Sequence, residues 1–175
     1  MRICLWAGAG AGKSATASGI HHKLKCRGYN IELVQEYIKK WAYQKRKPKS
    51  FDQVYIFGKQ LHAEDSLLQE GVEHIITDSP IMLGVYYAKK SGMKGWEELM
   101  ALGQAFDAQH PSINIFLNRE GIPYKQEGRY ETEAQALAND LEMKEFVKNN
   151  VVDFFEFKTI DLDGIVGSID FLLSQ

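Results

Sequence analysis

Residues 7–14 constrain what this chain can fold into more than any other stretch of its 175 residues. They read Ala-Gly-Ala-Gly-Ala-Gly-Lys-Ser, between a short apolar run at 3–6 and a helix-like stretch that begins at 15. Glycine takes positive φ angles without steric cost, so the backbone of this segment can approach a polyphosphate closely. Its N–H groups and the N-terminus of the following helix would then bind the phosphate oxygens. The pattern therefore predicts a strand, a phosphate-binding loop and a helix, in that order.

The loop also carries the two side chains that such a site requires. Lys13 is predicted to reach the β- and γ-phosphates of ATP, and the Ser14 hydroxyl to ligate Mg²⁺. The strict pattern has glycine at position 7, where this chain has Ala7, a substitution that the relaxed pattern accepts. The predicted nucleotide contacts of the loop are Gly8, Ala9, Gly10, Ala11, Gly12, Lys13 and Ser14.

The composition is that of an ordinary globular protein, with 45% apolar and 25% charged residues. A net charge of −2 gives no strong overall field toward nucleic acid or a membrane, so any such contact must be local. The length favours a single domain over residues 1–175. No apolar run is long enough for a membrane span and no signal peptide is recognisable, so we expect no membrane association and no N-terminal extension. Cys4 and Cys26 have no disulfide or metal-site spacing, which favours a cytoplasmic setting.

Apolar runs and helical patterns alternate along the whole chain. The predicted strands cover 2–6, 30–34, 72–77, 113–117 and 154–160. The predicted helices cover 12–26, 50–70, 81–90, 94–110, 132–149 and 161–174. This order predicts an α/β fold of three layers, α/β/α, around a five-stranded parallel sheet.

Two of the predicted strands end in acidic residues. Glu36 follows the second strand and Asp78 follows the third. Ligands of open α/β sheets bind beyond the carboxyl ends of the strands, so both carboxylates are expected beside the phosphate loop. Asp78 is predicted to hold Mg²⁺, and either Glu36 or Asp78 to accept a proton from an attacking hydroxyl.

A basic stretch follows Glu36. Residues 39–49 hold six basic side chains and no acidic one, interleaved with Trp41 and Tyr43. Basic side chains neutralise phosphates and aromatic rings stack on bases, so the stretch predicts a contact with a nucleotide or with nucleic acid. Lys39 and Arg46 are the predicted substrate contacts.

A polar, glycine-containing segment at about 118–132 follows the fourth strand. It carries Arg119, Lys125 and Arg129, and in a protein with a phosphate loop such a segment is expected to act as a lid. Arg129 is predicted to neutralise charge on the transferring phosphoryl group, and Arg119 to contact the nucleotide.

With its phosphate loop, acidic strand ends and lid in this order, the chain resembles the small P-loop kinases. Within them it is similar to the group that includes nicotinamide riboside kinases and deoxynucleoside kinases. The resemblance implies the P-loop NTPase fold and transfer of phosphate from ATP. Two positions depart from the group: Asp78 is followed by Ser-Pro without the arginine of deoxynucleoside kinases, and Lys39 replaces the arginine of riboside kinases. Phage relatives of this group phosphorylate 5-hydroxymethyluracil within DNA, and the basic stretch would suit such a substrate.

The sequence therefore predicts an ATP- and Mg²⁺-dependent kinase whose acceptor is a hydroxyl of a nucleoside, a nucleotide or a hydroxymethylated base in DNA. Two alternatives remain open: a nucleoside monophosphate kinase, and a P-loop NTPase that couples hydrolysis to a partner. A homodimer is also possible, with its interface on the helices rich in Tyr and Phe. If the chain is encoded by a phage, its compartment is the host cytoplasm.

Overall fold

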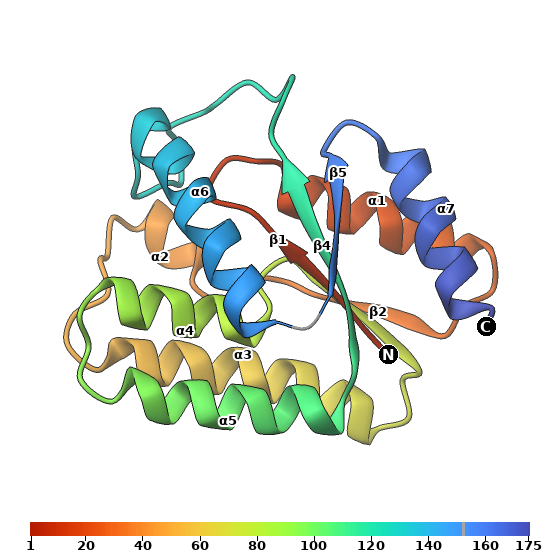
Figure 1. Cartoon of the computed structure of the whole chain (residues 1–175), viewed down its shortest axis with the longest axis horizontal. Helices are drawn as coiled ribbons and strands as arrows, with labels where there is room; N and C mark the ends of the chain where they lie inside the picture. Colours follow the sequence, from red (N-terminus) through yellow and green to blue (C-terminus); the bar gives the residue numbers. More distant parts are fainter. Residues whose placement is uncertain (152) are drawn as a thin grey trace.

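Five strands form one sheet in the computed structural model, which describes residues 1–151 and 153–175 (Figure 1). The strands are β1 (Arg2–Trp6), β2 (Ile31–Val34), β3 (His74–Thr77), β4 (Ser112–Asn118) and β5 (Phe154–Lys158). They lie in the order β2-β3-β1-β4-β5, and every neighbouring pair is parallel. This confirms the predicted α/β fold with a five-stranded parallel sheet.

Helices cover both faces of the sheet. They are α1 (Lys13–Cys26), α2 (Lys39–Tyr43), α3 (Asp52–Gln69), α4 (Ile81–Lys90), α5 (Trp96–Gln109), α6 (Glu133–Asn150) and α7 (Leu162–Leu173). Figure 1 shows α1 and α7 together on one side of the sheet and α3, α4 and α5 together on the other. In the part of the chain that the structure describes, no helix has the length and apolar character needed to cross a bilayer.

The central strand β1 divides the core between the two faces. All five of its residues are buried, and successive side chains of a strand point to opposite faces. Cys4 and Trp6 pack with the apolar residues of α3, α4, α5 and α6, whereas Ile3 and Leu5 pack with those of α1 and α7. A strand buried on both faces explains why the run before the phosphate loop is continuously apolar.

The predicted elements begin and end within two residues of the observed bounds. Strand β3 begins at His74, because Gly71 takes a positive φ of 84° and residues 71–73 form the connection from α3. Strand β5 ends at Lys158, where the chain turns and the Thr159 N–H donates to the carbonyl of Asn118 at 2.9 Å. The basic stretch begins with the short helix α2, which the sequence pattern did not predict.

A buried ionic cluster ties β1 to the helices at the end of the sheet opposite the phosphate loop. The Arg2 guanidinium lies 2.9 Å from Glu64 of α3 and 2.5 Å from Asp107 of α5. Arg2 is 1% exposed and Glu64 is fully buried. A buried charge is tolerated only when it is paired, so the register of α3 and α5 against β1 depends on this cluster.

Replacing Glu64 with alanine should destabilise the fold, because it removes a buried partner of Arg2. We expect a loss of about 3–5 kcal/mol in the free energy of unfolding, measured by urea denaturation. The matched control is Glu70→Ala at the exposed end of the same helix, which should change stability by less than about 0.5 kcal/mol. Similar losses for the two variants would contradict a structural role for the cluster.

Candidate functional site

One cavity of about 860 Å³ lies beyond the carboxyl ends of β1, β2 and β3. Its walls come from the phosphate loop, the segment after β2, helices α3 and α4, the lid segment 118–132 and the start of α6. The carboxyl ends of parallel strands meet at one edge of a sheet, which is where open α/β folds bind ligands. The topology thus brings the separate motifs of the sequence to one place.

The phosphate loop forms the floor of the cavity at one end. Gly10 and Gly12 have φ angles of 78° and 90°, in the left-handed region that favours glycine. Gly12 is the N-cap of α1 and no side chain caps that helix, so the N–H groups of its first turn are open to a ligand. Of the seven predicted nucleotide contacts, Gly8 and Ala11 are buried and do not line the cavity. The other five line it: Ala9, Gly10, Gly12, Lys13 and Ser14.

Lys13 lies over its own loop. Its Nζ donates to the carbonyls of Ala7 at 2.7 Å and Gly8 at 3.1 Å. Burial lowers the pKa of Lys13, and the carboxylates of Glu36 and Asp78 act in the opposite direction. A phosphate group at this place would offer the ammonium stronger, charge-assisted hydrogen bonds than the carbonyls do.

The two acidic residues take different positions, which bears on the choice between them as base. Asp78 is 2% exposed, and its Oδ1 accepts the backbone N–H of Glu36 at 2.7 Å. Glu36 lines the cavity, whereas Asp78 does not. Glu36 faces the cavity on one side and protein on the others, and this burial raises its pKa, helped by Asp78 and opposed by Lys13 and Lys39. Glu36 is therefore the one of these two carboxyl groups that faces a ligand in the cavity, and Asp78 holds its backbone N–H.

The residues around Ser14 could take up a magnesium ion only together with phosphates. The Ser14 Oγ accepts a hydrogen bond from the Lys39 ammonium at 2.9 Å, and the ammonium would have to move aside for this hydroxyl to ligate Mg²⁺. Within residues 1–151 and 153–175, no group of three acidic, His or Cys side chains forms a metal site. Mg²⁺ at nucleotides needs no such cage, because it keeps waters and takes its other ligands from the phosphates.

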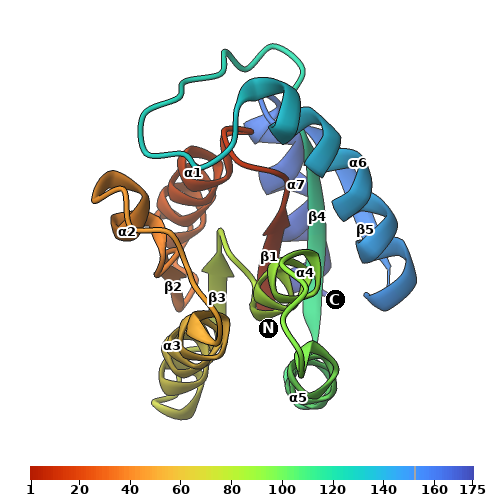
Figure 2. The ribbon, with the colours of Figure 1, turned by 90° about the vertical axis from the view of Figure 1, so that its left-hand side faces the viewer.

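The lid runs as a wide arc over the end of the sheet that holds the cavity (Figure 2). Arg129 lines the cavity, and its Nε is buried with no hydrogen-bond partner in the part of the chain that the structure describes. Its Nη1 makes only long contacts, 3.3 and 3.4 Å, to lid carbonyls of Glu127 and Gly128. Arg129 thus presents donors to a ligand, whereas Lys125 is exposed and away from the cavity wall.

Arg119, also predicted to contact the nucleotide, is not part of the cavity wall. It forms an ion pair with Asp140 of α6 at 2.5 Å and donates to the carbonyl of Ala9 at 3.0 Å. Its observed contacts are with the phosphate loop and α6.

The lid also contacts the phosphate loop and the basic stretch. The Tyr124 ring lies so close to Gly10 that a Cβ added there would be 2.8 Å from it. At the other end, Tyr43 packs on Gly128, and the Tyr130 hydroxyl donates to the carbonyl of Arg46 at 2.6 Å. We call this second pair of contacts the clasp, because it joins the lid to the stretch at 39–49.

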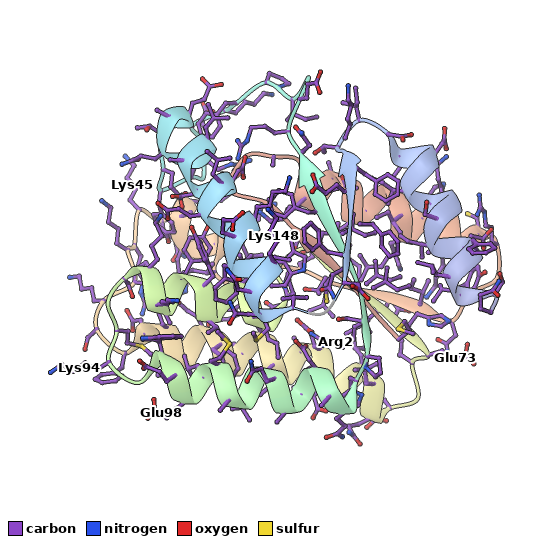
Figure 3. The ribbon with its side chains drawn as sticks, viewed as in Figure 1. Arg2, Lys45, Glu73, Lys94, Glu98 and Lys148 are labelled. Atoms are coloured by element: carbon purple, nitrogen blue, oxygen red, sulfur yellow. The ribbon has the colours of Figure 1, made fainter. Side chains whose placement is uncertain are left out.

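Within the basic stretch, Lys39 and Lys47 line the cavity. Arg46, a predicted substrate contact, instead places its guanidinium 3.3 Å from the centre of the Trp41 ring and does not line the cavity. Lys45 points outward at the edge of the molecule (Figure 3).

Several cavity residues were not among the predicted site residues. The cavity is also lined by Gln53 and Ile56 of α3, Leu83 and Tyr87 of α4, and Glu131 of the segment 118–132. Leu83 and Tyr87 are four residues apart, which places them on one face of the helix that follows Asp78, and this spacing could have identified the wall. Tyr87 packs against the core cluster that contains its neighbour Tyr86 and also lines the cavity.

Solved structures share this fold over nearly the whole chain. A deoxyadenosine kinase from M. mycoides, solved with dCMP and a flexible dCDP, has a TM-score of 0.58 and 20% identity, and the match covers 99% of this chain and 98% of that one. The same kinase with bound dATP gives 0.57 and 20% over the full length of both chains. The YorR protein of Bacillus subtilis, in complex with phosphorylated GDP, gives 0.60 and 17% over 99% and 96%. No protein-family model and no curated protein sequence matches the chain. At these identities the likeness establishes the shared fold and nothing beyond it.

Substituting Gly128 with alanine should open the clasp. A Cβ at this position would lie 2.6 Å from the Tyr43 ring, and the φ of 69° would cost a further 1–2 kcal/mol or so. We expect faster trypsin cleavage after Lys45 and Lys125, because both segments lose their mutual contact.

The control for backbone strain is Gly92→Ala, whose φ is 70° and whose added Cβ meets nothing within 4 Å. If both variants are cleaved equally fast, the faster cleavage of Gly128→Ala comes from backbone strain and the clasp does not protect these segments.

Proposed function

We propose that this protein is an ATP-dependent kinase that transfers the γ-phosphoryl group to a hydroxyl of a nucleoside or nucleotide. The observation that carries the proposal is the meeting of a phosphate loop, a cavity-facing Glu36 with a raised pKa, and the unpartnered donor of Arg129 around one cavity. Phosphoryl transfer requires mainly positioning and charge neutralisation, which these groups supply.

Each group then has one role. The N–H groups of residues 10–14 and the Lys13 ammonium hold the phosphates of ATP, and Arg129 neutralises charge on the group in transfer. The acceptor oxygen forms a bond to the γ-phosphorus while the bond to the β–γ bridging oxygen breaks, which leaves ADP. Glu36 accepts the hydroxyl proton, and Asp78 holds Glu36 in place through its backbone N–H. Bound Mg²⁺, with Ser14 as its protein ligand and Asp78 beside it, would neutralise phosphate charge.

The acceptor side of the cavity suits a planar base. Ile56 and Leu83 offer apolar surface, Tyr87 an aromatic ring and Gln53 an amide that can both donate and accept hydrogen bonds. The solved relatives in fold carry dCMP, dCDP, dATP and a phosphorylated GDP. These ligands support a nucleoside or nucleotide acceptor for this chain.

A second candidate acceptor is a 5-hydroxymethyl pyrimidine within DNA, as in a phage DNA-modification kinase acting in the host cytoplasm. It is favoured by the exposed cations Lys45, Lys47 and Lys49, of which Lys47 lines the cavity. A DNA strand would have to pass the clasp, so this acceptor requires the lid to open. The homodimer expected from the sequence stays a prediction.

The decisive experiment is a transfer assay with γ-labelled ATP over nucleosides, nucleoside monophosphates, and DNA with or without 5-hydroxymethyluracil. We expect one class to be labelled, and Lys13→Ala to lower the rate at least about 100-fold by removing a phosphate contact. Labelling of monophosphates on phosphate oxygen would instead identify a nucleoside monophosphate kinase. Release of free phosphate without labelling of any acceptor would identify a hydrolytic NTPase.

The DNA acceptor is tested by replacing Lys45, Lys47 and Lys49 together with glutamine. If DNA is the substrate, its affinity should fall and its salt dependence should weaken by about 0.9 in slope per lost phosphate contact. Arg46 is left intact because it packs on Trp41. The control removes the same charge elsewhere, at Lys59, Lys94 and Lys148, and should leave the slope unchanged. Unaltered DNA binding in the first variant would exclude the stretch as a DNA contact.

The pH dependence of the rate tests Glu36 as the base. Burial raises its pKa above the ordinary value of 4.5, and a base acts only when it is deprotonated. The rate should therefore fall as the pH drops through this raised pKa, at a higher pH than an ordinary glutamate would give. Glu36→Gln should lose about 10²–10⁴-fold in rate and no longer show this acid limb.

Glu32→Gln, on the strand that precedes Glu36, is the matched control, since Lys25 lowers the pKa of the Glu32 carboxyl. It should leave the profile unchanged. A full transfer rate in Glu36→Gln would exclude Glu36 and return the role to Asp78.

A further inference from the structure

Two side chains from opposite ends of the lid meet behind the phosphate loop. Arg119 stands at the start of the lid, after β4, and Asp140 lies about two turns into α6, after the lid. Their ion pair joins Arg119 Nε to Asp140 Oδ2 at 2.5 Å, and the side chains are only 12% and 16% exposed. Arg119 also donates to the carbonyl of Ala136 in α6 at 3.4 Å.

This pair holds two backbone groups of the phosphate loop. The second oxygen of Asp140 accepts the N–H of Gly8 at 2.5 Å, and Arg119 Nη1 donates to the carbonyl of Ala9 at 3.0 Å. The approach leaves no room for a side chain, since a Cβ on Gly8 would lie 2.5 Å from Asp140 and 3.1 Å from Arg119. Gly8 is thus required by the closeness of the pair, whereas Gly10 and Gly12 are required by their φ angles.

We propose that Asp140 is a positioning residue for nucleotide binding, acting on the loop directly at Gly8 and through Arg119 at Ala9. The inference rests on the proposed function, because it assigns residues 10–14 to the phosphates of ATP. N–H groups that bind phosphate must be left free of bonds within the protein, so the loop cannot hold its own shape with them. Anchors on the preceding peptide groups fix the loop from outside before ATP arrives, which lowers the ordering cost of binding.

The ion pair also reduces the repulsion that the Asp140 carboxylate would exert on ATP. A lone carboxylate next to a phosphate loop would repel ATP, but the guanidinium of Arg119 neutralises Asp140 through a charge-assisted hydrogen bond. Removing Arg119 alone would leave this charge uncompensated and partly buried, which is costly. The two residues should therefore behave as a unit.

The test measures ATP·Mg²⁺ affinity by calorimetry, independently of any acceptor. Asp140→Ala should weaken binding by about 10- to 100-fold, because it removes two charge-assisted hydrogen bonds. Asp140→Asn keeps the shape of the side chain but must point an NH₂ group at Gly8 or at Arg119, so it should also bind ATP more weakly. Gly8→Ala leaves both side chains present but displaces them, and we expect the same direction of change. Asp140→Ala and Arg119→Ala should be non-additive when combined.

The control is an ion pair on the same helix, one turn further on, where Lys144 lies 2.7 Å from Glu156 of β5. Glu156→Ala should leave ATP affinity unchanged. In any acceptor assay, the Asp140 variants should change the KM for ATP and leave the KM for the acceptor within about twofold.

The outcomes distinguish failure of the proposed function from failure of the positioning role of Asp140. Wild-type protein that does not bind ATP·Mg²⁺ would refute the proposed function itself. Wild-type protein that binds ATP, with folded Asp140→Asn binding equally well, would refute the positioning role. Tighter binding by Asp140→Ala would also refute it, since the carboxylate would then act only by repelling the nucleotide.

Discussion

A loop that binds phosphate with its backbone has to leave those N–H groups unbonded. Other parts of the structure must therefore hold the loop in shape. The loop is held at its entrance by the buried strand β1 and at its exit by α1. Between them, Asp140 and Arg119 hold the Gly8 N–H and the Ala9 carbonyl. The remaining amides can then converge on a ligand, because the backbone does not need them for its own stability.

The charges around the cavity follow a similar division between groups held by protein and groups open to a ligand. Asp78 and Arg119 are engaged by protein, whereas Glu36, Lys39 and Arg129 line the cavity. Burial raises the pKa of Glu36, and the nearby Asp78 carboxylate adds to this rise.

The segment 118–132, which we predict to be a lid, joins two parts of the cavity wall. Tyr124 contacts the phosphate loop, and the clasp at Gly128 and Tyr130 contacts the basic stretch. Under the proposed function, a small acceptor would bind beneath these contacts, whereas a polymer would require them to open. The choice between a free nucleoside or nucleotide and a base in DNA is therefore a question about the lid as well as about charge.

The sequence alone determined the fold class, the phosphate loop and the acidic strand ends, because each depends on a local pattern. These patterns are the alternation of strand-like and helix-like segments, the spacing of the glycines, and the acidic residue that follows a strand. It also placed Arg129 in a lid and Glu36 beside the phosphate loop. Only the tertiary structure decided that Arg119 pairs with Asp140, that Arg46 packs on Trp41, and that Glu36 and not Asp78 lines the cavity. For Asp140 the physical reason is the distance along the chain: Gly8 and Asp140 are 132 residues apart, and no local pattern records a contact that forms only when α6 packs against the phosphate loop. For Arg46 and Glu36 the reason is side-chain direction, which depends on how the segment after β2 packs on its neighbours.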